Sequence, residues 1–154
     1  MVVPEMLTPG GTHLNANLLN WCAERLGFGS SFQSGSVAIG VARDGELLAV
    51  AAFDNYRTSP TNGAPLSIEC SIAAESPRWA TRKTIGGILS YPFCHLGVQR
   101  VTALVQERNA RSIKFLNGIG FVREGFIRAA VDDGTGIYIT GMLREEAKRW
   151  LGEI

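Results

Sequence analysis

The chain has 154 residues, enough to bury one hydrophobic core, with 45% hydrophobic residues, 19% charged residues and a formal net charge of +1. This composition excludes an intrinsically disordered tail, and the small net charge gives no overall field that would indicate a nucleic-acid or membrane partner. We therefore expect a single globular domain over residues 1–154, whose partners are determined by local sites.

The cysteines occur in odd number and without the paired spacing of a redox motif or zinc site. They are Cys22, Cys70 and Cys94, each among apolar neighbours, which indicates reduced thiols rather than a disulfide framework. The most apolar stretch, residues 47–53, is too short to cross a bilayer, and residues 1–11 lack the basic start and apolar run of a signal peptide. We therefore expect a cytoplasmic protein.

The first half of the chain predicts one helix and a β-hairpin. Leu14, Leu18 and Cys22 recur at four-residue steps, which indicates an amphipathic helix. An Asp-Gly pair between two apolar runs indicates a tight hairpin turn. The expected elements are a helix over 12–26 with Thr12 as N-cap and Gly27 as stop, a linker over 29–35, strands over 36–42 and 47–53, a loop over 55–65 and a strand over 66–74.

The second half alternates helices and strands, which is typical of α/β layering. The expected elements are a helix from Arg78 that kinks or ends near Ser90, a strand over 100–105, a helix over 109–119, a strand over 121–130, a turn at 132–134, a strand over 137–143 and a short terminal helix. The β-α-β step places strands 66–74 and 100–105 in parallel, and residues 121–143 close an antiparallel hairpin. A mixed sheet with helices on both faces follows.

Strand 66–74 has one apolar face and one partly polar face. The two faces hold Leu66, Ile68, Cys70, Ile72 and Ala74, and Ser67, Glu69, Ser71 and Ala73. A carboxylate and two hydroxyls on a strand that begins a β-α-β unit indicate a cleft that reaches substrate, while a solvated edge strand is the alternative. Cys70 shares the apolar face and has no histidine near it in sequence, so we expect it in the core and not as a nucleophile.

A turn with a basic helix start follows this strand. Its free backbone N–H groups and the helix dipole would attract an anion, and Arg78 and Arg82 lie four residues apart on one helical face. A phosphate group between them would relieve their repulsion. The alternative is a solvated basic face paired with Glu75. The position at the carboxyl end of a parallel strand, where open α/β sheets bind ligands, favours the phosphate.

Several linked motifs resemble those of the GNAT acetyltransferases, in particular the branch similar to ribosomal-protein N-terminal acetyltransferases. They are Trp79-Ala80-Thr81, Tyr91-Pro92-Phe93, Leu96–Val101, Asn109–Ser112 and Gly120–Arg128. The resemblance runs from about residue 66 to residue 143. It implies the GNAT fold, with a mostly antiparallel mixed sheet and one splayed pair of parallel strands.

The resemblance also implies an acetyl-CoA site. The family's phosphate-binding signature maps onto Glu75, Arg78 and Ala80, and Arg78 stands where the family has a glycine, so basic side chains are expected to supply phosphate contacts. Asn109 would cap the next helix, and in relatives the matching residue also lies beside the pantetheine arm. The implied cofactor-binding residues are Ile72, Ala73, Ala74, Arg78, Trp79, Ala80, Thr81, Arg82, Lys83, Asn109, Ser112 and Phe115.

The implied mechanism is direct attack of a neutral amine on the thioester, in the gap between strands 66–74 and 100–105. Backbone N–H groups near Cys70–Ile72 would polarise the acetyl carbonyl. Glu69 is the first candidate for the general base and Asp54 the second, while a salt bridge to Arg100 or Arg57 is the structural alternative for Glu69.

A proton must also reach the departing thiolate. The family's usual tyrosine is replaced by Leu116, so Ser112 or Tyr138 would supply this proton, directly or through water. His13 and His95 are isolated and show no spacing of metal ligands, so no metal is expected.

These inferences favour an acetyl-CoA-dependent N-acetyltransferase that acts on a primary amine, either a protein or peptide N-terminus or a small molecule. The acceptor pocket would be built from the first helix, the 55–65 loop and the last hairpin. The alternative is a GNAT-fold module that binds CoA or a protein partner without turnover. A nucleotide-binding domain is disfavoured because no Walker or GxGxxG pattern follows a strand. Pairing of strand 137–143 with a second copy would give a homodimer.

Overall fold

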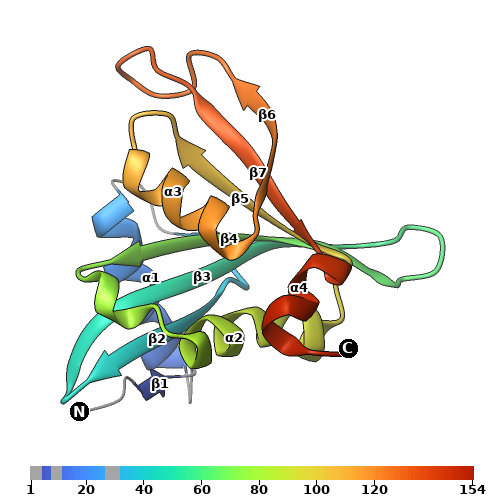
Figure 1. Ribbon diagram of the computed structural model, residues 1–154, viewed down its shortest axis with the longest axis horizontal. Coiled ribbons are helices and arrows are strands. Elements are labelled where there is room, and N and C mark those ends of the chain that lie inside the picture. The colour runs from blue at the N-terminus through green and yellow to red at the C-terminus, as the bar shows by residue number, and fades with distance from the viewer. Residues whose placement is uncertain (1–4, 8–11, 27–31) are drawn as a thin grey trace.

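The computed structural model describes residues 5–7, 12–26 and 32–154, and these form a seven-stranded sheet in the order β1-β2-β3-β4-β5-β7-β6 (Figure 1). The strands are β1 (Glu5–Leu7), β2 (Val37–Arg43), β3 (Glu46–Thr58), β4 (Pro65–Ala74), β5 (Arg100–Gln106), β6 (Val122–Ile127) and β7 (Ile137–Leu143). The helices are α1 (Thr12–Leu26), α2 (Arg82–Ser90), α3 (Ala110–Ile119) and α4 (Arg144–Leu151), with a 3₁₀ turn, η1 (Pro77–Trp79), and a π-helical turn, η2 (Tyr91–Leu96). The predicted cap by the Thr12 side chain, the stop at Gly27 and residues 29–31 of the linker lie outside what the structure describes.

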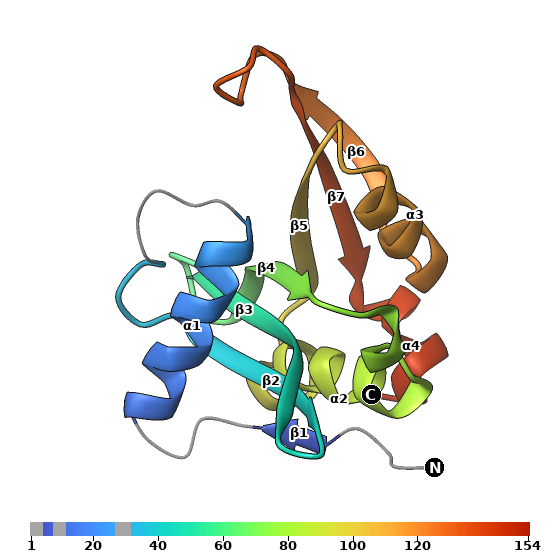
Figure 2. The same cartoon turned by 90° about the vertical axis from the view of Figure 1, so that its left-hand side faces the viewer.

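One pair of strands in this sheet is parallel. β4 pairs with β5 only from Ser67↔Arg100 to Glu69↔Thr102, and the other neighbouring strands are antiparallel. Beyond Glu69 the two strands run in different directions, as Figure 2 shows. The predicted mixed, mostly antiparallel sheet with a splayed parallel pair is confirmed.

Helices cover both faces of the sheet, as predicted. On one face Leu18 and Cys22 of α1 pack on Ala38, Val50 and Ala73. On the other face a larger cluster joins α2, α3 and α4 to the sheet. It includes Ile85, Ile88, Leu89, Leu116, Ile119 and Ala147 from the helices and Phe53, Ile68, Cys70, Val101 and Met142 from the strands. We refer to these two faces as the α1 face and the α3 face.

Some element boundaries differ from the prediction. β3 continues to Thr58 and β4 begins at Pro65, so residues 55–58 and 65 of the expected 55–65 loop belong to a strand ladder with bulges. The turn between them is closed by the Ser59 N–H, which donates to the Ala64 carbonyl at 2.8 Å. β6 ends at Ile127, before the positive φ of Ala129. The three-residue strand β1 was not predicted, because so short a segment carries no periodicity.

The helix after β4 ends at Ser90, where the prediction placed a kink or stop, and continues as the π-helical turn η2. Its two glycines serve packing. A Cβ at Gly86 would lie 3.5 Å from the Trp150 carbonyl oxygen, and one at Gly87 would lie 3.1 Å from Met6 Cε. The small residues therefore let α4 and β1 approach α2 closely.

The predicted route to a homodimer is wrong. β7 lies between β5 and β6 and pairs with both, so strand 137–143 has no free edge for a second copy. Among the described residues, no helix is long and apolar enough to span a membrane.

Candidate functional site

The divergence of β4 from β5 exposes backbone groups along β4. The Gln99 N–H donates to the Leu66 carbonyl at 2.9 Å, so the even-numbered residues of β4 direct their backbone groups toward β5. The Glu75 N–H, from an odd-numbered residue, donates to Leu48 of β3 at 2.9 Å. Beyond the last ladder pair, the N–H groups of Ile72 and Ala74 therefore face the gap.

The structure does not bring all three predicted strand residues to this gap. Ile72 is half-buried and Ala74 is exposed at its border. Ala73 instead pairs with Val50 of β3 and packs its side chain into the core on the α1 face. Alternation along the strand had already placed Ala73 on the opposite face from Ile72 and Ala74.

The turn between β4 and α2 uses most of its own N–H groups. Ser76 Oγ accepts from the Arg78 N–H at 3.2 Å, and the Ala80 N–H donates to the Pro77 carbonyl at 3.1 Å. Thr81 and Thr84 form a reciprocal cap, in which each side-chain oxygen accepts from the other's backbone N–H, at 2.9 and 3.1 Å. The expectation of a turn full of free N–H groups is wrong for these residues, because the turn satisfies them internally.

Two N–H groups at the start of α2 remain without an intrahelical acceptor, those of Arg82 and Lys83. The side chains around them differ from the prediction. Glu75 does not pair with the basic residues of the turn but with Arg25 of α1, at 2.6 Å. The Arg82 guanidinium donates to the Arg149 carbonyl at 2.8 Å and so turns toward α4, whereas Arg78 and Lys83 are exposed and form no ion pair among the described residues.

Aromatic packing connects this turn to α3. Trp79 is buried, and its ring lies 5.3 Å from that of Phe115. Asn109 caps α3 as predicted, because its side chain accepts from the Ser112 N–H at 3.1 Å. The Ser112 side chain is half-buried near the start of this helix. Leu116, at the position of the family's tyrosine, is buried in the core.

Two carboxylates lie side by side where β4 and β5 part. Asp54 of β3 is the register partner of Glu69 of β4, and Glu69 is also the last residue paired with β5. Asn55 Nδ2 donates to Glu69 Oε1 at 3.0 Å. Burial raises the pKa of Asp54, and the neighbouring charge of Glu69 raises it further.

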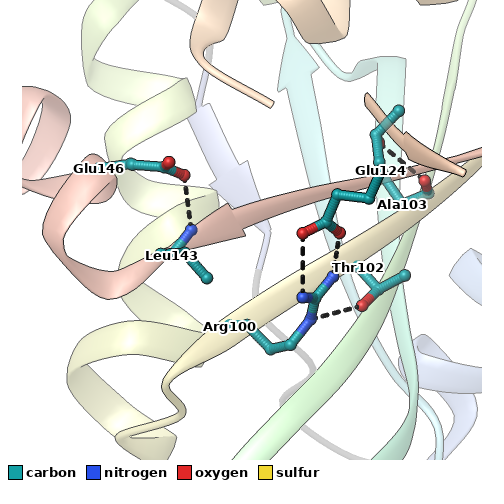
Figure 3. A network of polar contacts seen from close by, with 7 residues as sticks. Arg100, Thr102, Ala103, Glu124, Leu143 and Glu146 are labelled. Carbon is teal, nitrogen blue, oxygen red and sulfur yellow. Dashed lines mark hydrogen bonds and ion pairs between the residues drawn. The ribbon is translucent and has the colours of Figure 1, made fainter. Parts of the chain in front are cut away.

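No cation neutralises this pair among the described residues. The predicted alternative, a salt bridge from Glu69 to Arg100 or Arg57, is wrong, since Arg100 pairs with Glu124 instead (Figure 3). That contact raises the pKa of Arg100 and lowers the pKa of Glu124, chiefly through the hydrogen bond between them. The Asp54–Glu69 pair is therefore an uncompensated negative site.

A cavity of about 350 Å³ lies beside Asp54, between the start of β2 and the π-helical turn. Its lining includes Phe53, Asn55, Tyr56 and Tyr91. The rings of Phe53 and Tyr91 lie 5.1 Å apart, and burial raises the pKa of Tyr91. Sequence reasoning missed this wall because its members come from distant segments. The polar run Asp54-Asn55-Tyr56 at the end of an apolar strand was the available signal.

The two candidate proton donors lie on the other side of the sheet from Glu69. Tyr138 pairs in register with Val105 and packs against the core on the α3 face, where its ring lies 4.9 Å from that of Phe126. The Arg123 guanidinium lies 3.8 Å from the centre of the Tyr138 ring. Ser112 belongs to α3, which covers the same face. The predicted base and acids thus approach the gap from opposite faces.

No protein-family model matches the sequence, and no curated protein matches it. Solved structures do match. A ribosomal-protein-S5-alanine acetyltransferase from Vibrio fischeri gives a TM-score of 0.67 at 12% identity, over 92% of this chain and 93% of that one. An acetyltransferase of the GNAT family from Streptococcus pneumoniae gives 0.64 at 14% identity, over 90% of this chain and 99% of that one.

A further structure, of a proposed acetyltransferase, is 25% identical with a TM-score of 0.60. The match covers 74% of this chain, which spans only 62% of that protein. These similarities concern the arrangement of the chain, and they agree with the strand order and the splayed parallel pair described above. The resemblance predicted from the sequence is thereby confirmed: the chain has the fold of the GNAT acetyltransferases.

Proposed function

We propose that the protein is an acetyl-CoA-dependent N-acetyltransferase that acetylates a primary amine. The observation that carries this proposal is the uncompensated Asp54–Glu69 pair at the point where β4 and β5 part. An ammonium group is attracted to two neighbouring carboxylates, and one of them must then remove a proton to make the amine nucleophilic.

The residues on the α3 side of the gap fit an acyl-CoA. Arg78 and Lys83 offer unpaired positive charge, and the first N–H groups of α2 offer hydrogen bonds, to a pyrophosphate. The N–H groups of Ile72 and Ala74 would bind the amide and thioester carbonyls that enter the gap. Acetyl-CoA supplies the acetyl group as a thioester. Trp79 and Phe115 would form an apolar wall beside it.

In the proposed reaction the acceptor amine loses a proton on the α1 face, and the departing thiolate gains a proton on the α3 face. Glu69 takes a proton from the acceptor ammonium on the α1 face. As the amine nitrogen bonds to the acetyl carbon, the carbon–sulfur bond breaks, and the thiolate receives a proton from Tyr138 or Ser112 on the α3 face. The second proton that the nitrogen loses passes through water to the deprotonated Tyr138 or Ser112, and Glu69 releases its own proton to solvent. The products are an acetylated amine and free CoA, without a covalent enzyme intermediate.

The open part of the α1 face favours an acceptor with an apolar body. Leu104 of β5 is 45% exposed beside the gap and lies opposite Ile139 of β7. Ile127 of β6 is 43% exposed and pairs with Ile137 in the same sheet face. An amine whose ammonium meets Glu69 would lay its remaining atoms along this apolar surface.

The alternative is a GNAT-fold module that binds CoA or a protein partner without turnover. Two features support it, namely arginine in place of the signature glycine at Arg78 and the apolar Leu116 in place of the family's tyrosine. Both features leave the fold intact and bear only on the rate and on CoA affinity.

The test is release of free thiol from acetyl-CoA with a panel that contains hexylamine, phenethylamine, spermidine and short peptides. We expect turnover, with the apolar amines preferred. Glu69→Gln should lower the rate by about a hundredfold or more while CoA binding, measured by calorimetry, is retained. Glu46→Gln, which alters an exposed carboxylate in the β2–β3 hairpin, is the control.

Three outcomes would count against this proposal. CoA binding without turnover of any amine supports the binding module. An unchanged rate in Glu69→Gln, at neutral and mildly alkaline pH, removes Glu69 as the base. No heat with CoA on folded protein refutes the cofactor site.

A further inference from the structure

Arg100 is held by three contacts on the α1 face, away from Glu69. Its Nη2 and Nη1 atoms donate to the two carboxylate oxygens of Glu124, at 2.5 and 3.2 Å, and its Nε donates to Thr102 Oγ1 at 3.1 Å (Figure 3). The bidentate pair and the threonine together engage all the guanidinium nitrogens. The orientation of Arg100 is therefore fixed by two side chains from different strands.

The local backbone is arranged to allow this pair. Glu124 lies two residues after Val122, the register partner of Gly141, and so shares its strand face, while the register shift between Arg123 and Gly125 leaves Glu124 without a partner on β7. The pair crosses β7 above Gly141, and a Cβ at this position would collide with both Arg100 Nη2 and Glu124 Oε1. The ion pair thus spans three strands because the middle strand has a glycine beneath it.

Without Glu124, Arg100 could reach Glu69. Thr102 is the register partner of Glu69, and Arg100 is the partner of Ser67, so Arg100 and Glu69 are diagonal neighbours on adjacent strands. Such neighbours lie about 7–8 Å apart, within reach of a long side chain. Glu69 has only the hydrogen bond from Asn55 to compete with such an ion pair.

We propose that Glu124 is a positioning residue: by holding Arg100 over Gly141 it keeps the guanidinium away from Glu69, so that the carboxylate pair is left for the acceptor ammonium. This inference rests on the proposed function. An arginine on Glu69 would occupy the place of the ammonium and make the carboxylate a weaker proton acceptor. Glu124 itself contacts neither the gap nor the acceptor in this scheme.

The experiment compares Glu124→Gln, Arg100→Gln and the double variant in amine acetylation. We expect Glu124→Gln to lower kcat/KM for the amine by about tenfold to a hundredfold, part of what a general base contributes, with KM for acetyl-CoA unchanged. Arg100→Gln should stay near the parent value, and the double variant should recover to the same level. Glu145→Gln, from the exposed pair with Lys148 on α4, is the matched control.

Gly141→Ala provides a second perturbation, because its Cβ separates the same pair while both charges remain. It should behave like Glu124→Gln and be rescued by Arg100→Gln. The pair is partly exposed, so its loss should leave the fold intact.

The rescue separates positioning from a structural role. If Arg100→Gln is as slow as Glu124→Gln, or the double variant does not recover, the proposal is overturned. If the parent protein turns over no amine, the proposed function fails, and the position of Arg100 is then decided by a crystal structure of Glu124→Gln. An Arg100–Glu69 ion pair in that structure supports the inference, and a guanidinium that remains over Gly141 overturns it.

Discussion

Thr84 holds together the turn that we assign to the phosphates, and its replacement by valine is the sharpest test of that assignment. Its side chain has no solvent exposure, its hydroxyl donates to the Trp79 carbonyl at 2.5 Å, and its oxygen accepts from the Thr81 N–H at 2.9 Å. Valine has nearly the same shape and can make neither bond. The substitution therefore removes half of the reciprocal cap, and the bond from the Thr84 N–H to Thr81 Oγ1 remains, while the packing volume is kept.

The expected cost follows from these two hydrogen bonds. Each hydrogen bond contributes about 0.5–1.5 kcal/mol net to stability. The Trp79 carbonyl and the Thr81 N–H still bond to each other at 3.0 Å in the variant, so neither group is left without a partner. The free energy of unfolding should therefore fall by about 1–2 kcal/mol. For a chain of this length the Tm falls by about 2–8 °C. Because the cap orients the N–H groups of Arg82 and Lys83, CoA affinity should fall about tenfold or more.

Thr84→Ser is the matched control. It keeps the hydroxyl and loses one buried methyl group, which costs about 1 kcal/mol, so both variants lose similar stability. Urea titration gives the stability and calorimetry gives the Kd for CoA. Only the valine variant should lose CoA affinity. If serine weakens CoA binding as much as valine, or if neither does, the capped turn does not organise the phosphate site.

Two further predictions concern ionisable groups whose pKa burial raises. Alkylation of the native protein should modify Cys94 alone, because Cys94 is exposed whereas burial raises the pKa of Cys22 to about 12 and raises the pKa of Cys70 as well. Mass spectrometry counts the modified thiols, and rapid labelling of more than one thiol would contradict this prediction. Asp54→Asn should raise the free energy of unfolding at neutral pH by up to about 1 kcal/mol. The raised pKa of Asp54 means that the folded state binds its proton more tightly than the unfolded state, so stability is lost as pH rises from the ordinary aspartate pKa through the raised value. Urea titrations should therefore show the gain at neutral pH and none below the ordinary pKa, and a variant less stable than the parent at neutral pH would refute the reasoning.

Much of the fold could be predicted because its signals are local. The Asp-Gly turn, the alternation of strand and helix periods and the cap at Asn109 each occupy a few consecutive residues, and the structure contains all three. The bulges at the end of β3 were not predictable, because a bulge depends on which residues face each other across the ladder. The same limit applies to β1, whose three residues form a strand only because β2 offers an edge.

The candidate site was less predictable than the fold for the same reason. Glu69 was found from its place on a polar strand face, but its neighbour Asp54 becomes opposite only through the register of β3 with β4. The sequence did not predict which carboxylate pairs with Arg100. The contact between Arg100 and Glu124 depends on the register of β6 with β7 and on a glycine in β7, two strands that follow Arg100 in the sequence.

The α1 face carries two neighbouring carboxylates, Asp54 and Glu69, and an arginine, Arg100, that pairs with neither of them. Like charges opposite each other in a sheet are destabilising, and the chain carries a cation within reach that would relieve the repulsion between Asp54 and Glu69. In the structure Arg100 pairs with Glu124 instead, and a partly exposed pair of this kind contributes little to stability. This arrangement leaves the repulsion between Asp54 and Glu69 in place and forms the Arg100–Glu124 pair, which stabilises the fold little. It is therefore poor for stability but suited to binding a cation, because an arriving ammonium group makes the interaction with Glu69 that Arg100 does not make.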